Sequence, residues 1–135
     1  MNTGAPQGCV LSPTLYTLYT NDYCVDHPDT TLIKFADDSV FQGFFTTSST
    51  ESYYFSEINR FVDWCKDNYL ILNVSKTKEM VVDFRLNKDD TLPLTINGEQ
   101  VETVQTYRYL GFVIDDKLNW HEHVNALCKK LNQDP

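Results

Sequence analysis

Two adjacent carboxylates, Asp37 and Asp38, are the residues of this sequence best suited to chemistry. They lie between two short apolar runs in the segment 31–43, a pattern that predicts a β-hairpin with the aspartates at its tip. Two carboxylates this close repel each other unless a cation or water screens them. Mg²⁺ prefers carboxylate oxygens and keeps waters and substrate phosphates as its other ligands, so the pair would suit phosphoryl transfer. On these two residues alone, a solvated Asp-Asp turn is the favoured interpretation.

The residues around the pair belong to a series of ordered motifs. Phe35-Ala36-Asp37-Asp38 resembles the catalytic (Tyr/Phe)-x-Asp-Asp box of the reverse transcriptases of LINE-type (non-LTR) retrotransposons. Residues Thr3–Pro13 look like the motif that opens the second half of the palm in those enzymes. Three later segments resemble, in order, the Leu-Asn-x-x-Lys-Thr motif, the primer grip and the segment leading into the thumb: Leu72–Thr77, Tyr109–Gly111 and Asp115–His123. The resemblance extends over nearly the whole chain.

The resemblance implies roles for individual residues at a metal and nucleotide site. Asp37 would be the metal-binding carboxylate of the box, and Asp38 would assist in placing the metal and the primer end. Gln7 and Gly8 would line the nucleotide pocket, since Gly lets the backbone approach a ligand closely and Gln offers both a donor and an acceptor. Phe35 would lie near the primer end, and we expect it on the same strand face as Asp37, two residues away.

Two further roles follow from the resemblance. Lys76 would help to protonate the leaving pyrophosphate, and a lysine near phosphates also stabilises charge. An ordinary exposed lysine is the alternative for Lys76. Tyr109, Leu110 and Gly111 would form the turn that holds the primer strand.

The implied parent activity is RNA-templated DNA synthesis with Mg²⁺, or with Mn²⁺ in its place, from an RNA template, a DNA primer and deoxynucleoside triphosphates. The implied fold is α+β: a partial polymerase palm over 1–115, with an antiparallel sheet and helices packed on one face, and the start of the thumb connection over 116–135. The family also uses an earlier aspartate, which this sequence does not show in a recognisable motif, so we expect the chain to be inactive alone. Two alternatives stay open: a non-catalytic remnant, and an interaction module that self-associates through an exposed sheet edge.

The elements before residue 78 must position the carboxylate pair. Ser12-Pro13 predicts an N-cap and first helical residue of a helix that runs to about Tyr23, with Leu15, Leu18 and Tyr19 on one face. Ser48 and Glu51 fit a capping box. Apolar residues at helical spacing after it predict a helix to about Asn68, followed by a loop over 70–77.

The second half is richer in strand signals. Glu79–Arg85 is predicted to be a strand, and Asn97-Gly98 predicts a hairpin over Leu94–Val101. We expect one strand over Thr106–Ile114, interrupted by Gly111. The spacing of apolar residues predicts a final amphipathic helix over Trp120–Leu131.

A second candidate metal site lies in that last helix, at His121-Glu122-His123. Two histidines at positions i and i+2 do not share a helix face. No Cys or His cluster supports them, so surface positions are favoured over a zinc site.

Composition narrows the function classes. The chain has 135 residues, 41% of them hydrophobic, and a net charge of -8, which fits one globular domain and argues against a free-standing nucleic-acid binder. It has no apolar run long enough to cross a membrane and no recognisable signal peptide. Four cysteines without CxxC spacing indicate reduced thiols, so we expect an intracellular protein, cytoplasmic or nuclear.

Overall fold

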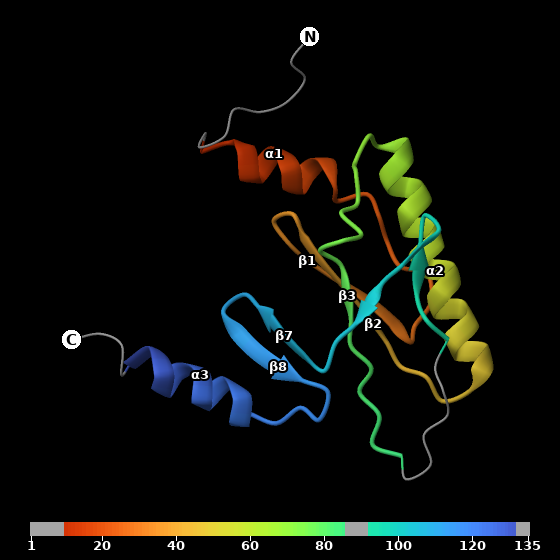
Figure 1. Ribbon diagram of the computed structural model, residues 1–135. Helices are drawn as coiled ribbons and strands as arrows, with labels where there is room; N and C mark the ends of the chain where they lie inside the picture. The colour runs from red at the N-terminus through yellow and green to blue at the C-terminus, as the bar shows by residue number, and fades with distance from the viewer. Residues whose placement is uncertain (1–9, 86–91, 132–135) are drawn as a thin grey trace. The chain divides into compact units, whose positions relative to one another are not determined.

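The computed structural model describes residues 10–85 and 92–131 (Figure 1). Helices and strands are mixed along the chain, which confirms the predicted α+β class. The chain divides into two compact units, which meet in the sequence at Ile71 and Leu72, and each is described by itself. In the described ranges, no helix combines the length and the apolar character needed to cross a membrane.

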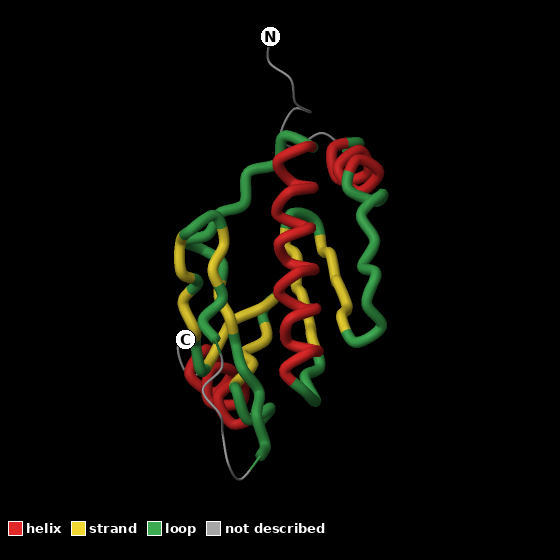
Figure 2. Tube along the Cα trace, turned by 90° about the vertical axis from the view of Figure 1, so that its right-hand side faces the viewer, coloured by secondary structure: helices red, strands yellow, loops and turns green. Residues whose placement is uncertain are grey.

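The first unit is built on a β-hairpin with a long helix on one of its faces. Its elements are α1 (Ser12–Tyr19), β1 (Thr30–Phe35), β2 (Asp38–Gly43) and α2 (Ser48–Asp67). Strands β1 and β2 pair in antiparallel register from Thr30↔Gly43 to Phe35↔Asp38, which leaves a two-residue turn. Figure 2 shows α2 running along the hairpin. The predicted hairpin and the predicted second helix are both confirmed.

Helix α1 differs from the prediction at both ends. Its N-cap is Leu11, with no side-chain cap, so Ser12 begins the helix instead of capping it. The helix ends at Tyr19 and not near Tyr23, because the side chain of Tyr23 is buried in the core of the unit. Leu15, Leu18 and Tyr19, the residues predicted to share one helix face, are 52%, 67% and 48% exposed.

Helix α2 begins one residue earlier than its predicted capping box implies. Thr47 is the N-cap, and its hydroxyl accepts from the Thr50 N–H while the Thr50 hydroxyl accepts from the Thr47 N–H. The capping box is therefore Thr47 with Thr50, and Ser48, the predicted N-cap, is the first residue of the helix. The apolar face of the helix is buried as predicted, in four residues at helical spacing: Ile58, Phe61, Val62 and Cys65.

Aromatic side chains fill the space between α2 and the hairpin. Phe61 of α2 packs edge-on against Phe41 of β2 at 4.9 Å and against Tyr23 at 5.0 Å between ring centroids. Trp64 stacks on Phe61 at 5.8 Å. Edge-to-face and offset pairs at these distances are favourable beyond the area they bury, so this cluster fixes the hairpin against the helix.

The second unit contains short paired strands and a terminal helix. β3 (Lys78–Glu79) pairs in parallel with β6 (Glu102–Thr103), while β4 (Thr95–Ile96) and β5 (Glu99–Gln100) form the hairpin predicted at Asn97-Gly98. β7 (Thr106–Tyr109) and β8 (Phe112–Asp115) form another hairpin, and α3 (His121–Leu131) follows. These three pairs and the β1–β2 hairpin of the first unit are the four two-stranded sheets formed by the described strands.

Two strand predictions need correction here. The strand expected over Glu79–Arg85 stops at Glu79, and the Asp83 carboxylate accepts from the Arg85 N–H, a local bond that competes with a strand ladder. The strand expected over Thr106–Ile114 is a hairpin, because Leu110 and Gly111 both have positive φ, as a tight two-residue turn requires.

Candidate active site

The carboxylate pair lies at the tip of the β1–β2 hairpin, as the sequence predicts. Asp37 occupies the turn, and Asp38 is the first residue of β2. Both are exposed, and neither carboxylate accepts a hydrogen bond or joins an ion pair within the described ranges. A rigid hairpin therefore presents two uncompensated negative charges to solvent.

The turn differs from the prediction in how it places Phe35 relative to Asp37. The residue in the left-handed region is Ala36, with φ 51°, so neither aspartate supplies that conformation. The left-handed region costs a residue with a Cβ about 1 kcal/mol. Because Asp37 lies in the turn, Phe35 does not share a strand face with it; Phe35 pairs directly with Asp38 and is 59% exposed. The aromatic ring and the second carboxylate thus lie side by side on the hairpin face that Phe41 does not occupy.

Lys34 ties the hairpin to the first helix. Its ammonium donates to the carbonyl of Thr20, at the C-terminal end of α1, and lies 5.9 Å from the ring centroid of Trp64. Burial raises the pKa of the neighbouring Cys65 thiol to about 11, and the charge of Lys34 opposes this rise. A cation at a helix C-terminus is favourable, so Lys34 holds α1 close to the strand that ends at the tip.

Tyr16 of α1 is coupled electrostatically to the turn. Burial raises the pKa of the Tyr16 phenol, and the negative charge of Asp37 raises it further. The phenol is therefore close enough to the turn to respond to that carboxylate. Tyr16 is half-buried, whereas Leu15 and Leu18 on the same helix are exposed.

The donor set of the tip fits a magnesium-type ion in part. Carboxylate oxygens are the ligands that such an ion prefers, and water and phosphate oxygens complete its shell. Nowhere in the described ranges do three His, Cys, Asp or Glu side chains form a group that could hold a metal ion. Asp37 and Asp38 would therefore hold a metal through two carboxylates, with the remaining positions open to water or a phosphate.

The other candidate residues lie in the second unit or outside the described ranges. Lys76 is exposed in a turn organised by Asn73, whose carbonyl accepts from the N–H of Lys76 at 3.2 Å and from the N–H of Thr77 at 3.1 Å. The Asn73 side chain accepts a further bond from Ser75 at 2.7 Å. Gln7 and Gly8 lie outside the described residues, so their predicted role stays a prediction.

The predicted primer-grip residues occupy the turn of the β7–β8 hairpin. Tyr109 ends β7, and Leu110 and Gly111 form the turn with φ 47° and 90°. Leu110 is exposed at the tip. The Tyr109 hydroxyl is buried and has no hydrogen-bond partner in the part of the chain that the structure describes.

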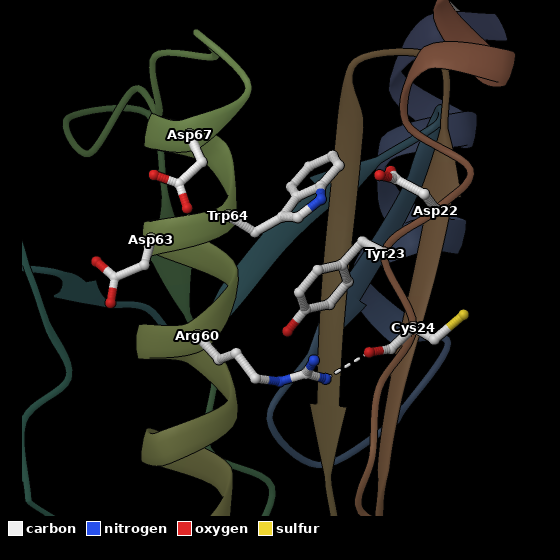
Figure 3. Close-up of a pocket in the computed structure, with 7 residues that line it drawn as sticks. All are labelled: Asp22, Tyr23, Cys24, Arg60, Asp63, Trp64 and Asp67. Carbon is white, nitrogen blue, oxygen red and sulfur yellow. Dashed lines mark hydrogen bonds between the residues drawn. The ribbon is translucent and has the colours of Figure 1, made fainter.

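A cavity of about 290 Å³ lies in the first unit, between α2 and the segment 22–24 (Figure 3). Arg60 extends into it and donates to the carbonyl of Cys24 and to the Glu57 carboxylate. The rest of the lining is acidic or aromatic: Asp22, Tyr23, Asp63, Trp64 and Asp67. Neither Asp37 nor Asp38 lines this cavity, so it is separate from the hairpin tip.

Two groups of residues were missed by reasoning from the sequence. Glu57 is buried and binds Tyr23, which lies 34 positions away in the sequence, so only the spacing of Glu57 and Arg60 on α2 could have hinted at the group. His123, interpreted as a surface residue, is half-buried and accepts a hydrogen bond from the Val113 N–H. Its place three residues into a predicted helix gave no sign of that contact.

Comparison with known proteins finds one matching family and several similar proteins. The model of a family described as reverse transcriptase (RNA-dependent DNA polymerase) matches residues 1–114. The chain is 28% identical to the RNA-directed DNA polymerase from mobile element jockey of Drosophila melanogaster, over 92% of this chain and 14% of that protein. It is 30% identical to the probable RNA-directed DNA polymerase from transposon X-element of the same species, over 95% of this chain and 14% of that protein. The probable polymerase from transposon BS, also from that species, is 26% identical over 98% of this chain and 16% of its own length. The chain thus spans less than a fifth of these relatives, and no solved structure matches it.

Proposed function

The chain belongs to the reverse transcriptase (RNA-dependent DNA polymerase) family, in its LINE-type, non-LTR retrotransposon branch, and from this premise we propose that it forms part of the palm of an RNA-directed DNA polymerase. The palm part would be residues 1–115, and 116–135 would begin the connection to the thumb. The observation that carries the proposal is the exposed Asp37-Asp38 pair at the tip of a packed hairpin. Such a pair is otherwise costly, since two like charges repel at short range.

The hairpin tip would hold the metal of the reaction. Reverse transcriptases generally use divalent metals, and Asp37 and Asp38 would bind Mg²⁺, or Mn²⁺ in its place. Such an ion, when bound, neutralises charge on the attacking and leaving oxygens. The packing of the hairpin against α2 and the bond from Lys34 to Thr20 keep the two carboxylates in a fixed place.

The remaining candidates would handle the nucleic acid and the nucleotide. The partners would be an RNA template, a DNA primer and a deoxynucleoside triphosphate, whose α-phosphorus the primer 3′-hydroxyl attacks as pyrophosphate leaves. Phe35, beside Asp38, would lie against the primer end, and Lys76 would assist the leaving group from its exposed turn. Gln7 and Gly8 would shape the nucleotide site. Tyr109, Leu110 and Gly111 would hold the primer strand.

A paramagnetic metal titration tests the proposal without requiring polymerase activity. We expect Mn²⁺ to broaden the amide NMR signals of residues around Asp37 first, and the Asp37→Asn variant to need about tenfold more metal, because one of two carboxylate ligands is lost. Asp67→Asn removes the same charge at the exposed end of α2 and serves as the control, with an unchanged titration. Equal affinity in the native chain and in Asp37→Asn would contradict the proposal.

A second candidate function is an interaction module, and the two-stranded sheet of the first unit favours it. In the register of β1 and β2, the backbone groups of Ser39 and Phe41 point to the outer edge of β2, where no described strand pairs with them. An open edge of this kind can pair with another chain.

Sedimentation at increasing concentration distinguishes this candidate from the first. Self-association through the edge predicts a mass that rises with concentration and a weaker rise for Ser39→Lys, since a lysine on an edge opposes pairing. Ser49→Lys, on the exposed surface of α2, adds the same charge elsewhere and is the control. A monomer at every concentration would dismiss the interaction module.

A further inference from the structure

Helix α3 contacts the β7–β8 hairpin of the second unit through the side chain of His123. His123 is half-buried, whereas the other residues of α3 are exposed. Its ring lies 5.3 Å from the ring of Phe112, at 32°, and 5.8 Å from the ring of Trp120, at 67°. The imidazole is thus enclosed by the first residue of β8 and the residue before α3.

The same ring accepts a hydrogen bond from the edge of the hairpin. The Val113 N–H donates to Nδ1 of His123 at 3.2 Å. Tyr109 and Phe112 close the two-residue turn, so the next pair, Arg108↔Val113, is the type whose backbone groups point away from the partner strand. His123 therefore supplies the partner for an N–H that the hairpin itself leaves unpaired.

The connection between β8 and α3 brings the histidine into this place. Asp115 is 8% exposed, and its carboxylate accepts from the N–H groups of Lys117 at 2.9 Å and Asn119 at 2.8 Å. These two bonds turn the chain back toward β8 immediately before α3 begins. The connection is short and is held by these two hydrogen bonds. It therefore restricts where α3 can lie relative to the hairpin once His123 is docked.

The hydrogen bond requires the neutral ring. In a protonated histidine both nitrogens are donors, so Nδ1–H would face the Val113 N–H. The charged and titratable groups on the surrounding elements are Arg108 on β7, Asp115 at the end of β8, Asp116 and Lys117 in the connection, and His121 and Glu122 on α3. Within the described ranges none of the carboxylates forms an ion pair with the ring, so no charge partner compensates the lost bond.

We propose that neutral His123 is a positioning residue that docks helix α3 on the hairpin bearing Tyr109, Leu110 and Gly111, and that protonation of the ring releases it. The primer-holding role of that turn rests on the proposed function, while the docking rests on the contacts above. If both hold, the start of the thumb connection and the primer-holding turn form one body at neutral pH and separate in acid.

Amide hydrogen exchange of the 135-residue chain tests the docking directly. We expect the protection factor of the Val113 amide to fall at least about tenfold when the pH is lowered from about 7.5 to about 5, because a protonated ring cannot accept the bond from the Val113 N–H. His123→Asn places an amide oxygen where Nδ1 lies and does not titrate, so it should keep the protection at both pH values. His123→Gln carries its oxygen one bond further out and should lose protection at both.

Two controls make the result decisive. His121→Asn changes an exposed histidine of the same helix and should behave as the native chain. The Val101 amide, which is buried in the second unit and donates to the Leu94 carbonyl at 2.9 Å, should stay protected in every variant and so reports that this unit is folded. The proposal is overturned if Val113 protection is the same in the native chain, His123→Asn and His123→Gln, or if His123→Asn loses as much as His123→Gln. A failed metal titration at the hairpin tip would remove the proposed function and leave these results unchanged.

Discussion

At the scale of single residues, the first unit depends on one buried carboxylate. Glu57 is 6% exposed, and its Oε1 accepts from the Tyr23 hydroxyl at 2.7 Å and from Nε of Arg60 at 2.9 Å. The Arg60 guanidinium also lies 4.8 Å from the centroid of the Tyr23 ring. Burial alone would raise the pKa of Glu57, but the bonds from Tyr23 and Arg60 outweigh burial and hold that pKa below its ordinary value of 4.5.

The pH dependence of stability follows from the lowered pKa of Glu57. Because the folded-state pKa of Glu57 is below the unfolded one, its contribution is complete above about pH 4.5 and is lost as the pH falls through the folded-state pKa. We expect Glu57→Gln to lower the free energy of unfolding by about 2 kcal/mol at pH 7, with a smaller difference from the native chain in acid. Urea unfolding of both chains at pH 7 and in acid measures this difference in the free energy of unfolding.

Asp63→Asn is the control for Glu57→Gln. Asp63 lies on the same helix in an exposed ion pair with Lys66 at 3.3 Å, and such pairs contribute about 0–1 kcal/mol. A loss in Glu57→Gln no larger than in Asp63→Asn would show that the buried network does not stabilise the unit.

At the scale of elements, the site depends on how closely the hairpin approaches α2. Gly43 ends β2, and a Cβ at that position would lie 2.5 Å from Cδ2 of Tyr54 and 2.9 Å from Cε1 of Phe45. Gly43 is needed there for space. The hairpin reaches its place beside α2 only because this residue has no side chain.

A substitution at Gly43 tests that packing. We expect Gly43→Ala to lower the free energy of unfolding by about 1–3 kcal/mol, because the added methyl group overpacks a filled contact. Combining it with Tyr54→Leu should recover part of the loss, since the residue that the methyl meets is then smaller. Gln42→Ala, at the exposed neighbouring position, is the control. Additive effects of Gly43→Ala and Tyr54→Leu in urea unfolding would refute the contact.

At the scale of the whole molecule, the net charge and the family favour different conclusions about whether the chain binds nucleic acid. The net charge of -8 opposes binding to a phosphate backbone, whereas the family implies a nucleic-acid template and primer. The chain spans less than a fifth of the relatives it matches, so a basic surface for the duplex can belong to other parts of such proteins.

Primer extension tests the site in the isolated chain. We expect the 135 residues to extend no primer on an RNA template with deoxynucleotides and Mn²⁺, because the tip presents two carboxylates and the described ranges hold no group of three metal ligands. The assay resolves labelled products of single-nucleotide addition, with Asp37→Asn as the matched chain. Extension that disappears in Asp37→Asn would contradict this prediction and give the chain an activity of its own.

Local patterns in the sequence were sufficient for several elements and for the carboxylate pair. Neighbouring residues predicted helix α2, the hairpin at Asn97-Gly98 and the hairpin that carries the two aspartates at its tip. The structure confirms all three. The reason is that helix periodicity and turn chemistry act over a few residues. The Leu110-Gly111 turn was misread as an interruption within one strand, although the same chemistry operates there.

Only the tertiary structure decided the contacts between distant residues. Tyr23, beyond the end of α1, donates to Glu57, and Lys34 donates to the carbonyl of Thr20. His123 accepts from an N–H at the edge of β8. Each of these contacts depends on a folded backbone that brings two segments together and leaves one polar group without a local partner. Sequence spacing does not identify the distant partner, because a buried polar group can be satisfied from any segment that the fold places beside it.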